Sequence, residues 1–141
     1  MTSTQFVPLR GTRVLVAEDD ALLALEIVCL LRNAGAEVLG PAKTLAAALV
    51  LAKTNLLSCA VLDVDLRGET VFPAARLLKD RGVRIIFHTG FGEPDLLRRE
   101  WPDAKVLTKP SSLELMIRTV REASLDVEFG STTPPLPTGR D

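Results

Sequence analysis

Short apolar runs bounded by turn-forming residues recur along the chain, and longer, mostly helix-favouring stretches separate them. An apolar run that ends at a glycine, a proline or a carboxylate is typical of a strand buried on both faces of a parallel sheet. Such runs predict strands over residues 13–17, 37–39, 59–62, 83–88 and 104–107.

The stretches between these runs carry helix signals. Gly35 and Gly82 are typical residues at the ends of helices, Thr44 is a favourable N-cap, and Pro73 is tolerated only in a first turn. The predicted helices cover residues 21–34, 44–53, 70–81, 94–99 and, from a cap at Ser111 or Ser112, up to about residue 123. Strands that alternate with helices predict an α/β fold, a doubly wound five-stranded parallel sheet with helices on both faces.

Composition supports one globular domain. The chain has 141 residues, 47% of them hydrophobic and 25% charged, so it can bury a core. A net charge of −1 offers no basic field for nucleic acid and no polybasic segment for a membrane surface. The N-terminus lacks the apolar core of a signal peptide and no apolar run reaches membrane-spanning length, so we expect a cytoplasmic protein.

The two ends of the chain and the cysteines complete this outline. Residues 1–11 are predicted to be an N-terminal extension, 12–126 the domain, and the proline-rich 127–141 a disordered tail. Cys29 and Cys59 lie inside apolar runs, which predicts buried or half-buried thiols in a reducing compartment rather than a disulfide.

Polar side chains stand where the predicted strands end. Glu18 and Asp19 follow the first strand, Asp63 the third, Thr89 the fourth, and Lys109 comes just after the fifth. The carboxyl ends of parallel strands meet at one edge of a sheet, so these groups are expected to converge. Three neighbouring carboxylates repel one another unless a cation compensates, and their oxygens suit Mg²⁺. With a lysine and a hydroxyl, they would form a site for a phosphoryl group.

These residues resemble the receiver domain of two-component response regulators. The resemblance rests on Glu18-Asp19-Asp20 after Val-Leu-Val-Ala, Asp63 after Ala-Val-Leu, Thr89-Gly90 and Lys109-Pro110, and it covers about residues 12–124. It implies a flavodoxin-like (CheY-like) sheet with strand order 2-1-3-4-5. It also implies that Asp63 accepts a phosphoryl group from a sensor histidine kinase or a histidine phosphotransfer protein.

The resemblance further implies the role of each site residue. Mg²⁺ would be held by Asp19, by Asp63, by Glu18 through water and by the backbone carbonyl of Asp65. Thr89 and Lys109 would bind the phosphoryl oxygens, with a cis bond between Lys109 and Pro110. Asp20, beside the metal residues, is assigned instead to the N-cap of the first helix.

Two departures from the common receiver pattern bear on the switch. Leu66-Arg67-Gly68-Glu69 replaces the usual loop with its Met-Pro and Asp-Gly pairs, and Val106 occupies the position of a switching tyrosine or phenylalanine. Residues 87–92 resemble the Phe-Ala-Thr-Gly-aromatic-Gly signature of an atypical, mostly stand-alone receiver subfamily. We therefore expect Gly90, Phe91 and Gly92, together with Val106, to form the switch, and a monomer or weak homodimer that signals through a downstream protein target.

The first predicted helix is apolar on more than one side. A helical period assigns Leu23, Ile27, Leu30 and Ala34 to the core, which leaves another apolar stripe outside. An apolar outer face usually marks a contact site, and the resemblance implies that the kinase docks on this helix. The predicted docking residues are Leu22, Leu25, Val28 and Cys29.

Other interpretations remain open at this point. The domain could keep the receiver fold and bind partners without phosphorylation. Asp63-Val64-Asp65 also resembles the Asp-x-Asp motif of haloacid-dehalogenase-type phosphatases, although Arg67 stands where that family has threonine or valine. We expect no enzyme activity beyond self-phosphorylation and autodephosphorylation. His88 and Trp101 are predicted to be packing residues.

Overall fold

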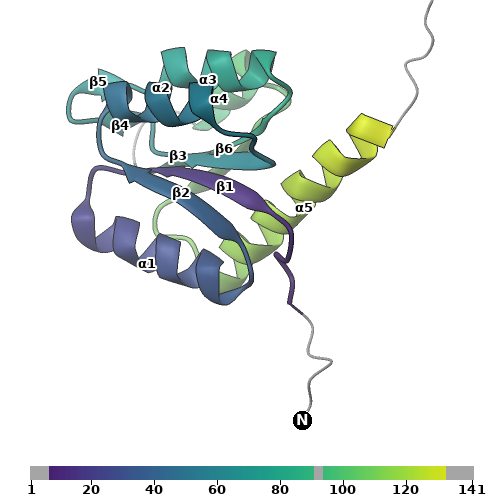
Figure 1. The fold of residues 1–141 in the computed structure, drawn as a ribbon. Coiled ribbons are helices and arrows are strands. Elements are labelled where there is room, and N and C mark those ends of the chain that lie inside the picture. Colours follow the sequence, from purple (N-terminus) through teal and green to yellow (C-terminus); the bar gives the residue numbers. More distant parts are fainter. Residues whose placement is uncertain (1–6, 91–93, 133–141) are drawn as a thin grey trace, which may run out of the picture.

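The computed structural model describes residues 7–90 and 94–132, which form a central parallel sheet between two layers of helices (Figure 1). The sheet has five strands in the order β2-β1-β3-β6-β7. Their bounds are β1 Arg13–Ala17, β2 Glu37–Ala42, β3 Cys59–Leu62, β6 Arg84–Thr89 and β7 Lys105–Thr108. Counted along this sheet, the order is the predicted 2-1-3-4-5, and the predicted fold class is confirmed.

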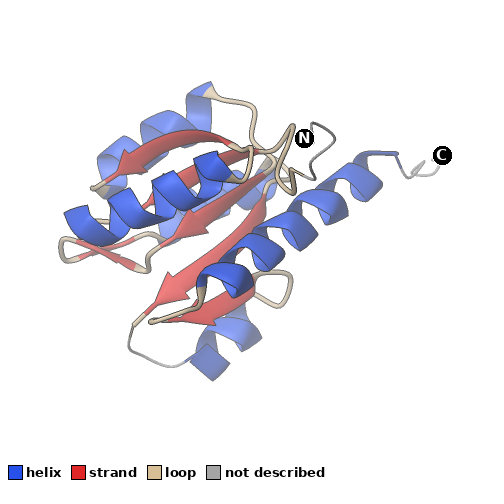
Figure 2. Ribbon diagram, turned by 90° about the horizontal axis from the view of Figure 1, so that it is seen from below, coloured by secondary structure: helices blue, strands red, loops and turns tan. Residues whose placement is uncertain are grey.

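Within residues 7–90 and 94–132, five helices cover the sheet, in agreement with the predicted number. Helices α1 (Ala21–Asn33) and α5 (Leu113–Thr132) pack on one face, and α2 (Leu45–Thr54), α3 (Phe72–Asp80) and α4 (Pro94–Glu100) on the other (Figures 1 and 2). Because side chains alternate along a strand, neighbouring residues enter different cores: Phe87 packs toward α3 and α4, whereas Ile86 packs toward α1 and α5.

A small hairpin follows β3 and was not predicted. Strands β4 (Asp65–Leu66) and β5 (Glu69–Thr70) pair antiparallel, and Arg67 and Gly68 form the turn between them with φ of 54° and 89°. Two successive residues with positive φ are typical of a type I′ turn, which fits the twist of a hairpin. The helix predicted over 70–81 therefore begins later, at Phe72, after the hairpin has closed.

Several element boundaries differ from the prediction, and β2 and α5 show the largest extensions. Strand β2 continues through Gly40 and Pro41 to Ala42, because this edge strand pairs with β1 along one side only. Helix α5 runs to Thr132, into the stretch assigned to a disordered tail, while residues 133–141 lie outside the described residues. In the N-terminal extension, Leu9 is fully buried and its N–H donates to the carbonyl of Ala34 at 2.8 Å.

Helix α1 turns a different stripe toward the sheet than predicted. Its buried residues are Ala24, Ile27, Val28 and Leu31, whereas Leu23 and Leu30 are only half-buried. The assignment of Val28 to the outer, docking side is therefore wrong. An almost wholly apolar helix offers more than one stripe with helical spacing, and contact with the sheet selects between them.

The cysteines differ from each other. Both thiols are free, as predicted, and Cys59 is buried, but Cys29 is exposed. Burial raises the pKa of the Cys59 thiol to about 12, so this thiol stays protonated and unreactive near neutral pH. Among the described helices, none is long and apolar enough to cross a membrane.

Candidate functional site

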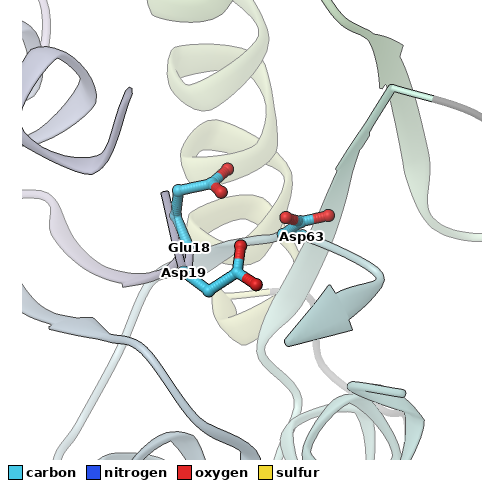
Figure 3. A group of neighbouring side chains, drawn as sticks. All are labelled: Glu18, Asp19 and Asp63. Carbon is cyan, nitrogen blue, oxygen red and sulfur yellow. The ribbon is translucent and has the colours of Figure 1, made fainter. Parts of the chain in front are cut away.

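Three carboxylates gather at the carboxyl ends of the two central strands. Glu18 and Asp19 directly follow β1, Asp63 follows the adjacent β3, and one oxygen of each lies within 4.8 Å of the others (Figure 3). Glu18 is 1% exposed, Asp63 is 9% exposed, and Asp19 is half-buried. These residues, called the carboxylate cluster below, are brought together as the sequence predicted.

Lys109 is the cation that reaches this cluster. Its Nζ lies 3.0 Å from Oε1 of Glu18 and 3.1 Å from Oδ2 of Asp63. Burial favours the neutral amine, but the hydrogen bonds to Glu18 and Asp63 outweigh it and raise the pKa of Lys109. The lysine therefore remains charged and binds both carboxylates at once.

The charges of the cluster are still unbalanced. Burial raises the pKa of Glu18 from 4.5 to about 7, although the hydrogen bonds from Lys109 and from the backbone N–H of Asp20 favour its charged form. One lysine faces three carboxylates, and a carboxylate-rich set of hard oxygen donors is what Mg²⁺ prefers. The residues present therefore fit a divalent cation held by Glu18, Asp19 and Asp63.

Backbone N–H groups bind the carboxylates of Asp19, Asp20 and Asp65. The N–H of Arg67, at the tip of the hairpin, donates to Oδ2 of Asp19 at 2.9 Å, a contact that the sequence did not reveal. Asp20 accepts from the N–H groups of Leu22 and Leu23 at 3.0 and 3.1 Å and is the predicted N-cap of α1. The carboxylate of Asp65 accepts from the N–H of Gly68 at 2.8 Å, so this side chain caps its own hairpin.

Thr89 ends β6 beside the lysine. The threonine is buried, and its carbonyl accepts from the backbone N–H of Lys109 at 2.8 Å. The Lys109–Pro110 peptide bond is cis, as expected. The residues expected to meet the phosphoryl group thus come from β3, β6 and the segment after β7, all at one edge of the sheet.

Known proteins resemble this chain, one in sequence and others in structure. The transcriptional regulatory protein PdtaR of Mycobacterium tuberculosis is 30% identical over 114 residues, which cover 79% of this chain and 56% of PdtaR. The structure of the response regulator PhyR from Brucella abortus matches with a TM-score of 0.72 and 30% identity, over 88% of this chain and 52% of PhyR. A response regulator receiver protein from Sinorhizobium medicae matches with a TM-score of 0.75 and 23% identity, over 84% of this chain and 98% of that one.

The chain has the fold of CheY-like receiver domains. It spans about half the length of the curated relatives it matches. No protein-family model matches the sequence.

The predicted switch residues lie only partly within the described residues. Gly90 is exposed, and a Cβ built on it would lie in ordinary contact with the side chain of Lys109. Val106 is half-buried and packs against the core that contains Trp101. Phe91 and Gly92 lie outside the described residues.

The outer face of α1 is apolar, although Val28 faces the sheet and does not belong to it. Leu22 is 68% exposed and Leu25 58% exposed, and Cys29 is exposed as well. These three residues are called the docking face below. Because they are grouped on one side of a single helix, they form a small exposed apolar patch, and such patches often mark contact sites.

His88 is buried, as expected of a packing residue. Its Nε2 lies 3.1 Å from Oγ of Ser111, and burial, reinforced by the charge of Lys109, lowers its pKa to about 4. The imidazole is therefore neutral at pH 7. It borders a cavity of about 200 Å³ between α1 and the start of α5, together with Leu23, Leu30 and Met116.

Proposed function

We propose that this receiver domain belongs to a two-component phosphorelay and that Asp63 accepts a phosphoryl group from a phosphohistidine. The observation that carries the proposal is the contact of buried Asp63 with Lys109 inside the carboxylate cluster. A carboxylate nucleophile beside a fixed cation and two further carboxylates suits transfer of a phosphoryl group. The donor would be a sensor histidine kinase or a histidine phosphotransfer protein.

In the proposed reaction, an oxygen of Asp63 attacks phosphorus as the bond to the donor imidazole nitrogen breaks. The electron pair of that bond leaves with the imidazole, and the product is an aspartyl phosphate. Lys109, kept protonated by its carboxylate partners, would pair with the phosphoryl oxygens, and the Thr89 hydroxyl would donate to them. Mg²⁺, held by Glu18, Asp19, Asp63 and the backbone carbonyl of Asp65, would neutralise charge on the phosphoryl group.

Phosphorylation would then act as a switch. An aspartyl phosphate brings about two negative charges into a site where Lys109 already contacts Asp63. Thr89 and Lys109 would move toward the phosphoryl group. This movement would shift a pre-existing equilibrium between conformations of the segment that comprises Gly90, Phe91, Gly92 and the start of α4. Val106 stands where other receivers have an aromatic side chain, in line with the Phe-Ala-Thr-Gly-aromatic-Gly subfamily. The altered surface would be read by a downstream protein rather than by nucleic acid.

The docking face would receive the kinase or phosphotransfer protein. Leu22, Leu25 and Cys29 are exposed on α1, whose N-cap directly follows the metal residues Glu18 and Asp19. A partner seated on this face would therefore hold its phosphohistidine near Asp63.

The test is phosphorylation by a small molecule. The protein is incubated with acetyl phosphate and Mg²⁺, and its intact mass is measured. We expect one phosphoryl adduct that requires Mg²⁺ and is absent in Asp63→Asn. Asp20→Asn is the matched control, because it removes a neighbouring charge while asparagine keeps the N-cap, and it should still form the adduct.

Two outcomes would contradict the proposal. No adduct under any condition, with Mg²⁺ still bound, would favour a receiver that binds partners without phosphorylation. Steady turnover of a generic phosphomonoester that is lost in Asp65→Asn would favour the phosphatase. The N–H of Gly68 donates to the Asp65 carboxylate and holds it in the hairpin. This contact argues against Asp65 as the general acid of a phosphatase.

A further inference from the structure

The β4–β5 hairpin is attached firmly to the domain although it is short. Leu66 of β4 is fully buried in the core between the sheet and helices α2, α3 and α4. At the base of the hairpin, the N–H of Val71 donates to the carbonyl of Val64 at 2.8 Å, and Val71 is also fully buried. The base is thus anchored in the core, and the turn at the tip extends from a rigid support.

The turn residues make contact with the carboxylate cluster. Arg67 is the one non-glycine residue with positive φ among residues 7–90 and 94–132, and its N–H donates to Oδ2 of Asp19 at 2.9 Å. A side chain in this backbone conformation is unfavourable and persists where surrounding structure imposes it. The next residue, Gly68, donates its N–H to the carboxylate of Asp65, which closes the turn.

The same hairpin also contacts Asp63, the carboxylate of the cluster that follows β3. The N–H of Asp65 points to Oδ1 of Asp63 at 3.4 Å. One element therefore contacts a carboxylate after β1 and another after β3. Groups that hold metal ligands in place commonly determine metal affinity, because a ligand that is already oriented loses less freedom on binding.

We infer that the hairpin is a positioning element that orients the Asp19 carboxylate for a divalent cation, with Gly68 and the side chain of Asp65 as its positioning residues. Holding one oxygen of Asp19 on the Arg67 amide restricts the orientations that the other oxygen can take. The inference rests on the metal site of the proposed function. It adds that the affinity of this site is set by the shape of a turn outside the carboxylate cluster.

The first experiment changes the turn without changing any charge. Gly68→Ala places a side chain at φ 89°, where a Cβ meets no atom within 4 Å, so its effect is backbone strain alone. Gly82→Ala is the matched control: φ is 80°, its Cβ also meets nothing within 4 Å, and it lies after α3, away from the site. Mg²⁺ affinity is measured by calorimetric titration. We expect about tenfold weaker binding for Gly68→Ala and an unchanged affinity for Gly82→Ala.

A second pair of variants isolates the hydrogen bond of Asp65. Asp65→Asn and Asp65→Ala remove the same charge, but only asparagine retains an oxygen that can accept from Gly68. We expect Asp65→Ala to bind Mg²⁺ several-fold more weakly than Asp65→Asn. In the metal-free protein, hydrogen exchange at the Arg67 amide should be faster in Asp65→Ala than in Asp65→Asn, because the turn opens.

The outcomes separate this inference from the proposed function. If the wild type binds Mg²⁺ but Gly68→Ala and Gly82→Ala bind it equally well, the hairpin does not position Asp19 and the inference is wrong. Equal affinities of Asp65→Asn and Asp65→Ala would also overturn it. If the wild type binds no Mg²⁺, the metal site of the proposed function itself fails.

Discussion

The two faces of the sheet are packed in different ways. Between the sheet and helices α3 and α4, the rings of Phe72, Phe87 and Trp101 form an aromatic cluster, with centroids 5.4 to 6.0 Å apart. The cations of Arg76 and Lys79 lie 5.9 and 5.8 Å from the centroid of the tryptophan ring. On the other face, the described core residues that contact α1 and α5 are aliphatic or sulfur-containing, and they border a cavity of about 200 Å³.

This difference indicates a division of roles. Phe87 is two residues before Thr89 on β6, so both side chains belong to the same face of the sheet. A displacement of Thr89 would therefore change the packing of the aromatic cluster and of α4. The opposite face carries the docking face and neutral His88 beside a cavity. We interpret the α1–α5 face as suited to recognition and the α3–α4 face as suited to switching.

The largest expected effect compares adjacent residues of β6. Phe87 and Ile86 are both fully buried but enter opposite cores. Phe87→Ala should lower the free energy of unfolding by about 4 kcal/mol, and Ile86→Ala by about 3 kcal/mol. The larger loss for Phe87 has two sources, the greater apolar area of its ring and the edge-to-face contacts of that ring with Phe72 and Trp101.

Urea denaturation of both variants measures these losses, with Ile86→Ala as the internal control. Because the ring of Phe87 also buries more area, a loss for Phe87→Ala equal to or smaller than that for Ile86→Ala would mean that the ring contacts add no stability. The proposed difference between the two faces would then disappear.

A smaller effect should appear as pH dependence on the recognition face. The pKa of His88 falls from 6.5 in the unfolded chain to about 4 in the folded protein, because of burial and of the charge on Lys109, with Asp63 acting in the opposite direction. Between these two values the unfolded state binds more protons, so stability decreases as pH falls. From pH 7 to pH 4.5, the wild type should lose about 2 kcal/mol more than His88→Gln.

Urea titrations of both proteins at the two pH values check this prediction. The raised pKa of Glu18 has the opposite influence on stability in an overlapping range, but it is present in both proteins and cancels in the comparison. Parallel pH profiles would show that His88 is protonated in the folded protein or is not buried.

The smallest effect concerns the docking face. Leu25 on α1 and Val50 on α2 are each 58% exposed on helices that cover opposite faces of the sheet. Leu25→Gln should slow phosphotransfer from an autophosphorylated sensor kinase by about tenfold, because it removes an apolar contact at the centre of the docking face. Val50→Gln should leave the rate unchanged.

Acetyl phosphate separates docking from chemistry, since it needs no protein contact. Both variants should be phosphorylated by it at the wild-type rate. If Leu25→Gln is slower with acetyl phosphate too, or if Val50→Gln is as slow as Leu25→Gln with the kinase, α1 is not the docking helix.

Most of the fold could be predicted because its signals are local. Apolar runs marked the five strands of the main sheet, and Asp20 and Thr44 cap α1 and α2 as predicted. The hairpin escaped prediction because each of its strands has only two residues, too few for a pattern, although Arg67-Gly68 is a turn signal. The stripe of α1 that faces the sheet was predicted wrongly because several stripes of that helix are about equally apolar.

The sequence by itself determined which groups meet at the site. Once the strands are parallel, their carboxyl ends lie at one edge, so residues as far apart as Glu18, Asp63 and Lys109 had to converge. Only the tertiary structure decided how they are held: that Lys109 bridges two carboxylates, that the Arg67 amide binds Asp19, and that Val28 faces the sheet. Those contacts depend on how the β4–β5 turn and helix α1 are placed relative to the sheet. Local preferences along the chain do not determine that placement.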